Sequence, residues 1–187
     1  MTFQFTGYNL SYLEETRRKA VSPLGRQIYQ ARWDLVKEFC PEGMLFDYGC
    51  ADGAFLRQAP GGYCTTGWDI NPESPYHENE FYYPIDIMTM WDVIEHLPSP
   101  LAPIVEFKPK WLFICTPNAE TTDHKTFRYW RHFKPIEHLH YYTPLTLAMS
   151  LRSIGYSEEY LCYDEGRLRS AGNPEAIFTM VFRCLNN

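Results

Sequence analysis

The residues most capable of chemistry lie in the stretch Phe46-Asp-Tyr-Gly-Cys-Ala-Asp-Gly53 and in one later acid, Asp69. An apolar run leads into the stretch and stops at Gly49, and a short helix-like run follows Gly53. Glycines in a tight turn after a strand let the backbone approach a ligand closely, and an acid at the end of the next strand can accept hydrogen bonds from ribose hydroxyls. The spacing therefore predicts a binding site for a nucleoside-bearing cofactor.

A second group of candidates consists of four histidines in the later half of the chain: His96, His132, His138 and His140. A histidine can remove a proton from a hydroxyl group near neutral pH. Each histidine taken alone is more often a hydrogen-bonded structural residue than a base, so the prediction concerns the cluster. We expect this cluster to reach the active site, with His96, His138 and His140 as the candidate catalytic bases.

These side chains need a scaffold of alternating strands and helices to position them. Strands are predicted at residues 44–48, 63–70, 86–91, 111–116, 158–163 and 176–184. Helices are predicted at 11–39, capped by Ser11 and broken at Ser22-Pro23, in a short run after Gly53, and from Thr143 to near Gly155; residues 167–174 are predicted as a loop. The alternation predicts a mostly parallel sheet with helices on both faces, whose last two strands are antiparallel neighbours.

Length, composition and net charge indicate the class of protein and the kinds of partner it can bind. A chain of 187 residues with 45% apolar residues fits one domain with a sizeable core. The net charge of −6 makes nucleic acids poor partners, which favours a small-molecule substrate. No apolar run is long enough to span a membrane, and the N-terminus lacks the pattern of a signal peptide. The composition leaves the oligomeric state open, a homo-oligomer included.

Cysteine usage points to a reducing compartment. The six cysteines are scattered and form no C-x-x-C pair. This pattern is typical of reduced thiols rather than of a disulfide framework or a zinc site. The sequence therefore predicts a cytoplasmic protein.

Four motifs in order resemble those of class I S-adenosylmethionine-dependent methyltransferases, in the branch that acts on small molecules. They are Phe46–Gly53, Gly67-Trp-Asp-Ile-Asn-Pro72, the stretch from Met88 to Leu97, and Ile114-Cys-Thr-Pro-Asn118. A later segment that contains Glu137-His-Leu-His140 is similar to the substrate side of the same branch. The likeness runs from about residue 27 to the C-terminus.

The resemblance implies a Rossmann-like, doubly wound α/β fold. Its sheet would have seven mostly parallel strands with the last one antiparallel, and the third strand, sought in residues 71–85, would be stunted. Residues 1–187 would form a single domain, in which residues 1–40 are an N-terminal helical cap. Residues 41–187 would hold the cofactor-binding sheet, with a substrate-side insertion near 117–142.

The resemblance also assigns the cofactor, S-adenosylmethionine, to eight residues: Asp47, Gly49, Ala51, Gly53, Asp69, Ile70, Trp91 and Asp92. Asp47 would support the loop and the cofactor amino group, and Asp69 would bind both ribose hydroxyls. Ile70 would flank the adenine, while Trp91 and Asp92 would lie near the methionine end. Ala51 replaces the family's middle glycine, a change that fits unless this position needs a positive φ.

The implied activity is methyl transfer to a small-molecule acceptor, chiefly to oxygen, with nitrogen and carbon as alternative acceptor atoms. The segment 127–142, rich in aromatic residues, suggests a flat or apolar acceptor. Asp92-Val-Ile-Glu-His96 also resembles the divalent-metal stretch of ubiquinone-pathway O-methyltransferases, which makes Mg²⁺ a minority alternative with no metal ligand assigned. The shortened 71–85 segment motivates another alternative, a non-catalytic methyltransferase-like binding or assembly protein. A dehydrogenase is disfavoured because the glycine spacing is tighter than G-x-G-x-x-G.

Overall fold

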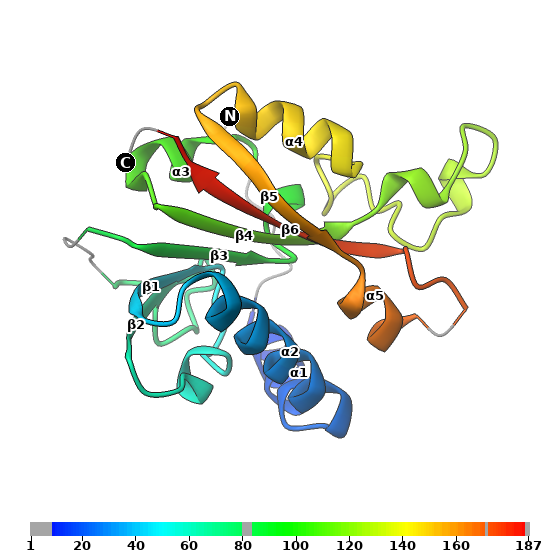
Figure 1. The fold of residues 1–187 in the computed structure, drawn as a ribbon. Coiled ribbons are helices and arrows are strands. Elements are labelled where there is room, and N and C mark those ends of the chain that lie inside the picture. Colours follow the sequence, from blue (N-terminus) through cyan, green and yellow to red (C-terminus); the bar gives the residue numbers. More distant parts are fainter. Residues whose placement is uncertain (1–8, 80–83, 171, 186–187) are drawn as a thin grey trace. The chain divides into compact units, whose positions relative to one another are not determined.

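A computed structural model describes residues 9–79, 84–170 and 172–185 (Figure 1). The chain forms two compact units, residues 1–89 and residues 90–187. Each unit is described by itself below. The predicted single domain, with its cap and its insertion, stays a prediction.

The first unit begins with two helices, α1 (Leu10–Ala20) and α2 (Pro23–Phe39). The predicted break between them is confirmed, because Ser22 caps α2 and Pro23 occupies its first position. The predicted cap at Ser11 is wrong: Asn9 accepts a hydrogen bond from the Tyr12 amide at 3.1 Å, so α1 starts one residue earlier than predicted. The apolar stripe of α2 is buried, and its Trp33 stacks on Phe55 with ring centroids 4.5 Å apart.

This unit also contains β1 (Gly43–Tyr48), β2 (Tyr63–Trp68) and the first three residues of β3 (Ile87–Trp91), whose last two residues belong to the second unit. β1 is parallel to β2 on one side and to β3 on the other. The register places Asp47 opposite both Gly67 and Thr89. The short helix predicted after Gly53 is a 3₁₀ turn, η1 (Leu56–Gln58). Because β1 and β2 run parallel, the loops that follow them leave the sheet at the same edge.

The second unit contains β4 (Trp111–Pro117), β5 (Tyr156–Cys162) and β6 (Ile177–Cys184). β6 is antiparallel to β4 and to β5, which confirms the predicted reversal of the last strand. The helices of this unit are α3 (Ala102–Phe107), α4 (Pro144–Arg152) and α5 (Asp164–Arg169). Three 3₁₀ turns are η2 (Ile94–His96), η3 (Ala119–Thr121) and η4 (Phe127–Tyr129). Thr143 caps α4 through a capping box, so the helix begins next to the predicted position, and it ends at Arg152, before Gly155.

Two elements differ from the prediction. The described residues hold six strands rather than seven: residues 71–79 form turns, and residues 80–83, part of the segment proposed for a stunted third strand, lie outside the described residues. Pro72 and Pro75 explain the turns, since proline removes the amide that a strand ladder needs. The loop predicted at residues 167–174 is also wrong at its start, because α5 extends to Arg169.

None of the helices within the described ranges is both long enough and apolar enough to cross a lipid bilayer.

Candidate functional site

The loop after β1 has the left-handed backbone of a close-approach turn. Gly49, Ala51 and Gly53 have φ angles of 83°, 51° and 76°. The Gly49 amide donates to the Trp68 carbonyl at 2.7 Å, which ties the loop to the end of β2. Ala51 therefore occupies a conformation that favours glycine, at a cost of about 1 kcal/mol for a residue with a Cβ.

Asp69 lies beside this loop. Its Oδ2 accepts a hydrogen bond from the Ala51 amide at 2.7 Å, and its Oδ1 accepts one from the Asn71 amide at 2.8 Å. The residue is only 8% exposed, and burial raises the pKa of its carboxyl while the two amide hydrogen bonds lower it. A carboxylate oxygen has two lone pairs, so each oxygen can accept one more hydrogen bond. The neighbouring Ile70 is 57% exposed.

A feature that the sequence prediction missed is the way residues 71–79 fold against the loop. The Ser74 hydroxyl donates to the Ala51 carbonyl, and His77 Nδ1 lies 3.0 Å from the Asp69 carbonyl. The Tyr76 ring covers Gly53 so closely that a Cβ at residue 53 would lie 2.4 Å from a ring carbon. The turn-forming residues Pro72, Ser74 and Pro75 were the available signal for this compact segment.

Asp47 is buried in β1, and its described hydrogen bond goes to a neighbouring strand rather than to the loop. Thr89 Oγ1 donates to its carboxyl at 2.6 Å. Burial raises the pKa of Asp47 to about 7, against the lowering effects of the Thr89 hydrogen bond and the Arg32 charge. The carboxyl therefore links β1 to β3 and titrates near neutrality.

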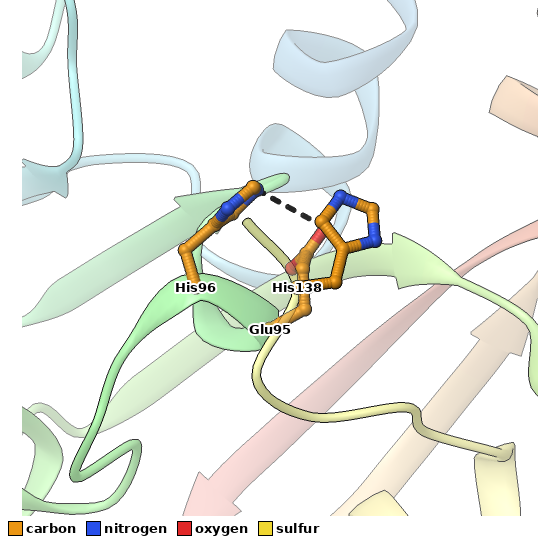
Figure 2. A group of neighbouring side chains, drawn as sticks. All are labelled: Glu95, His96 and His138. Atoms are coloured by element: carbon orange, nitrogen blue, oxygen red, sulfur yellow. Dashed lines mark ion pairs between the residues drawn. The ribbon is translucent and has the colours of Figure 1, made fainter. Parts of the chain in front are cut away.

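In the second unit, Glu95, His96 and His138 form an acid–histidine cluster (Figure 2). The two imidazole rings meet edge to face, with centroids 4.7 Å apart, and His96 Nε2 lies 3.9 Å from Glu95 Oε1. Main-chain bonds bring the two segments together, because the Glu95 carbonyl accepts from the amides of Leu139 at 2.8 Å and His140 at 3.1 Å. His96 and His138 thus meet as neighbours, whereas the His140 ring stacks on Tyr142.

Burial sets the protonation of the acid–histidine cluster. Burial raises the pKa of Glu95, which is 2% exposed, to about 8. The same effect lowers the pKa of His96, and it lowers the pKa of His138 to about 4. Both imidazoles are therefore neutral at pH 7 and able to accept a proton or a metal ion. Glu95 Oε2 is buried without a hydrogen-bond partner, as is Nε2 of the nearby His132.

Asp92, directly after β3, has a φ of 58°. Its amide donates to the Cys115 carbonyl on β4 at 2.9 Å. Its carboxylate receives two hydrogen bonds from the guanidinium of Arg169, a residue that no sequence motif indicated. The preceding Trp91 is buried.

Comparison with protein families gives a match over residues 18–159, most of the chain, to the family described as a methyltransferase domain. Comparison with curated proteins gives no match. Among solved structures, the magnesium protoporphyrin IX methyltransferase of Synechocystis, with bound S-adenosylhomocysteine, is similar with a TM-score of 0.63 and 13% identity over 95% of each chain.

Two further solved structures are similar. The N-methyltransferase NodS of Bradyrhizobium japonicum, in complex with S-adenosylhomocysteine, has a TM-score of 0.61 and 15% identity over 93% of this chain and 97% of NodS. The small RNA methyltransferase HEN1 has a TM-score of 0.61 and 21% identity over 88% of this chain, which spans only 26% of HEN1. At these identities the structures establish the fold, and the family match establishes membership. The chain therefore belongs to the methyltransferase domain family, and its Rossmann-like α/β fold is that of the class I S-adenosylmethionine-dependent methyltransferases.

Proposed function

We propose that the protein transfers the methyl group of S-adenosylmethionine to an oxygen atom of a small-molecule acceptor. The observation that carries the proposal is the contact of Asp69 with the left-handed loop at Ala51. It puts a carboxylate with spare lone pairs next to a turn whose backbone is left-handed at Gly49 and Ala51. In the proposal Asp69 receives the ribose hydroxyls, Gly49 allows the methionine part to approach, and Ile70 flanks the adenine. Gly53, which the sequence also predicted as a cofactor contact, is covered by the Tyr76 ring.

The acid–histidine cluster supports the choice of oxygen as acceptor atom. A hydroxyl must lose its proton as its oxygen attacks the methyl carbon, while the carbon–sulfur bond breaks and its electron pair stays on sulfur. Burial lowers the pKa values of His96 and His138, so both imidazoles are neutral at pH 7 and each has a ring nitrogen that can accept the proton. The same shift makes each a weaker base than a free imidazole. His140 stays a predicted base, because its described ring contact is with Tyr142.

A small molecule is proposed in preference to a nucleic acid because of the charge of the chain. The net charge of −6 opposes the approach of a polyanion. The exposed side chains of Tyr129 and Ile136, in the segment rich in aromatic residues, add apolar surface suited to a flat or apolar acceptor.

Removing the Asp69 carboxylate tests whether this residue binds the cofactor. The Asp69→Ala variant is expected to bind S-adenosylmethionine at least about 100-fold more weakly, because it loses two hydrogen bonds to a charged group, each worth about 1.5–3 kcal/mol. Isothermal titration calorimetry measures the affinity, and circular dichroism checks that the variant is folded. Asp123→Ala, which removes an exposed acid whose hydrogen bonds stay within its own turn, is the matched control.

The same titration separates the alternatives. A wild-type protein that binds no cofactor at millimolar concentration contradicts the proposal. Binding without turnover on hydroxyl-bearing acceptors favours a methyltransferase-like protein used for binding or assembly.

A divalent metal is a second candidate ligand, favoured by the partnerless Oε2 of Glu95. One ligand atom from each of Glu95, His96 and His138 can be chosen so that all lie within 4.8 Å of one another, which fits a single ion. Two imidazoles with one carboxylate suit Mn²⁺ or Zn²⁺ better than Mg²⁺, which prefers oxygen ligands. Such an ion, when bound, would lower the pKa of an acceptor hydroxyl.

Metal binding by the acid–histidine cluster is open to direct measurement. After treatment with a chelator, the wild-type protein is expected to bind one equivalent of Mn²⁺, and Glu95→Gln is expected to lower that affinity at least about tenfold because an anionic ligand is lost. Titration of the free Mn²⁺ electron paramagnetic resonance signal gives both affinities. The exposed His124, changed to Gln, serves as control. Failure of the wild-type protein to bind Mn²⁺ at millimolar concentration rules the candidate out.

A further inference from the structure

The strongest unassigned feature is a half-buried arginine in the connection between β5 and β6. Arg169 is the last residue of α5, and its side chain is 23% exposed. Its Nη1 and Nη2 donate to Oδ1 and Oδ2 of Asp92 at 2.9 and 2.8 Å, and Nη2 also lies 2.9 Å from Glu165 Oε2. A guanidinium that binds both oxygens of one carboxylate fixes the plane of that carboxylate as well as its position.

The packing of α5 against the backbone before β6 holds Arg169 close to Asp92. At Gly166 a Cβ would lie 1.9 Å from the Pro174 carbonyl oxygen and 2.8 Å from that of Ile177, so α5 rests directly on the backbone that leads into β6. Only a residue without a side chain permits this approach. The close packing sets the distance from which Arg169 reaches the end of β3.

Asp92 in turn needs support, because its backbone has the left-handed φ of 58° at a non-glycine residue. Such a conformation persists where the surroundings hold it, and it is concentrated at functional sites. Here the support comes from two sides: the Asp92 amide is bound by the Cys115 carbonyl, and the carboxylate is bound by Arg169. The guanidinium thus fixes the orientation of the Asp92 carboxylate while it also pairs with Glu165 within α5.

We propose that Arg169 is a positioning residue of the methyl-transfer site, which holds the Asp92 carboxylate in the orientation that binds the methionine end of the cofactor. The inference rests on the proposed function, in which Asp92 is a cofactor contact. Arg169 acts through Asp92 and touches no ligand itself. Glu165 supplies a second anionic partner, which keeps the guanidinium in place against Asp92.

A double-mutant cycle on S-adenosylhomocysteine affinity tests the proposal. Arg169→Gln is expected to weaken binding about tenfold, because the carboxylate loses its fixed orientation. In the Asp92→Asn background the same change is expected to have less than about a twofold effect, since the group through which it acts is gone. Arg169→Lys, which keeps the charge without the planar fork, is expected to fall between wild type and Arg169→Gln.

The control is Arg167→Gln, which removes an exposed arginine from the same helix and leaves affinity unchanged. Urea unfolding of every variant separates loss of affinity from loss of structure. If Arg169→Gln does not fold, Arg169→Lys replaces it in the double-mutant cycle. Wild-type affinity in folded Arg169→Gln, or additive losses in the double variant, overturns the proposal while leaving the proposed function intact. No binding by the wild-type protein overturns the proposed function, and this inference with it.

Discussion

The buried Asp47 carboxyl is expected to contribute a fall of up to about 4 kcal/mol in the free energy of unfolding as the pH rises from about 4 to about 7, measured as the difference in pH dependence between wild type and a variant without this carboxyl. Burial raises the pKa of Asp47 to about 7 in the folded protein, whereas an unfolded aspartate titrates near 4. Between these values the folded state binds more protons than the unfolded state, so each step up in pH favours unfolding. The stabilisation is complete below pH 4 and lost above pH 7.

Comparison with Asp47→Asn isolates this contribution. Asparagine keeps an oxygen for the Thr89 hydroxyl and carries no charge, so the variant should lack this part of the pH dependence and gain stability relative to wild type at pH 8. Urea denaturation at pH 5 and pH 8 provides the four free energies. Glu38→Gln, at an exposed acid of α2, should keep the wild-type slope. Equal slopes in wild type and Asp47→Asn would show that Asp47 is ionised across this range.

The second large effect is expected at Gly166. Gly166→Ala places a Cβ 1.9 Å from the Pro174 carbonyl oxygen, a backbone atom that cannot rotate away. Overpacking of this kind costs about 3 kcal/mol, which lowers the melting temperature by roughly 10 °C for a chain of this size. Differential scanning calorimetry measures the shift.

A glycine in open space gives the matched control for this substitution. A Cβ at Gly61 would meet no atom within 4 Å, so Gly61→Ala should change stability by less than about 0.5 kcal/mol. Because α5 carries Arg169, Gly166→Ala should also weaken cofactor binding where it folds. A melting temperature equal to wild type would mean that α5 does not pack on residues 174–177 as described.

The contact between Asp69 and the loop was predictable because it follows from strand order. Two parallel strands end at the same edge of a sheet, so a glycine turn after one and an acid after the other must meet. The reversed last strand was predictable for a similar reason, since only a loop was expected to join β5 to β6. In both cases the pattern joins two strands that are consecutive in the chain and needs no knowledge of side-chain packing.

Features set by packing could not be read in the same way. The left-handed φ of Ala51 depends on hydrogen bonds from its amide to Asp69 and from Ser74 to its carbonyl. Neither hydrogen bond could be predicted from the amino-acid composition or the residue pattern. Gly166 lowers the helix propensity of α5, and no helix was predicted there, with residues 167–174 predicted as a loop. Acidic residues at its start and arginines at its end were the signal for a short helix.

The main-chain bonds from Leu139 and His140 to the Glu95 carbonyl have a consequence for how such a protein can diversify. Backbone groups make these hydrogen bonds, so most replacements of the Leu139 side chain keep them. The stretch between β4 and this anchor can then vary in length and composition while His138 keeps its place beside His96. Under the proposed function, residues 118–137 could thus change to fit a different acceptor while His96 and His138, the proposed proton acceptors, stay in place.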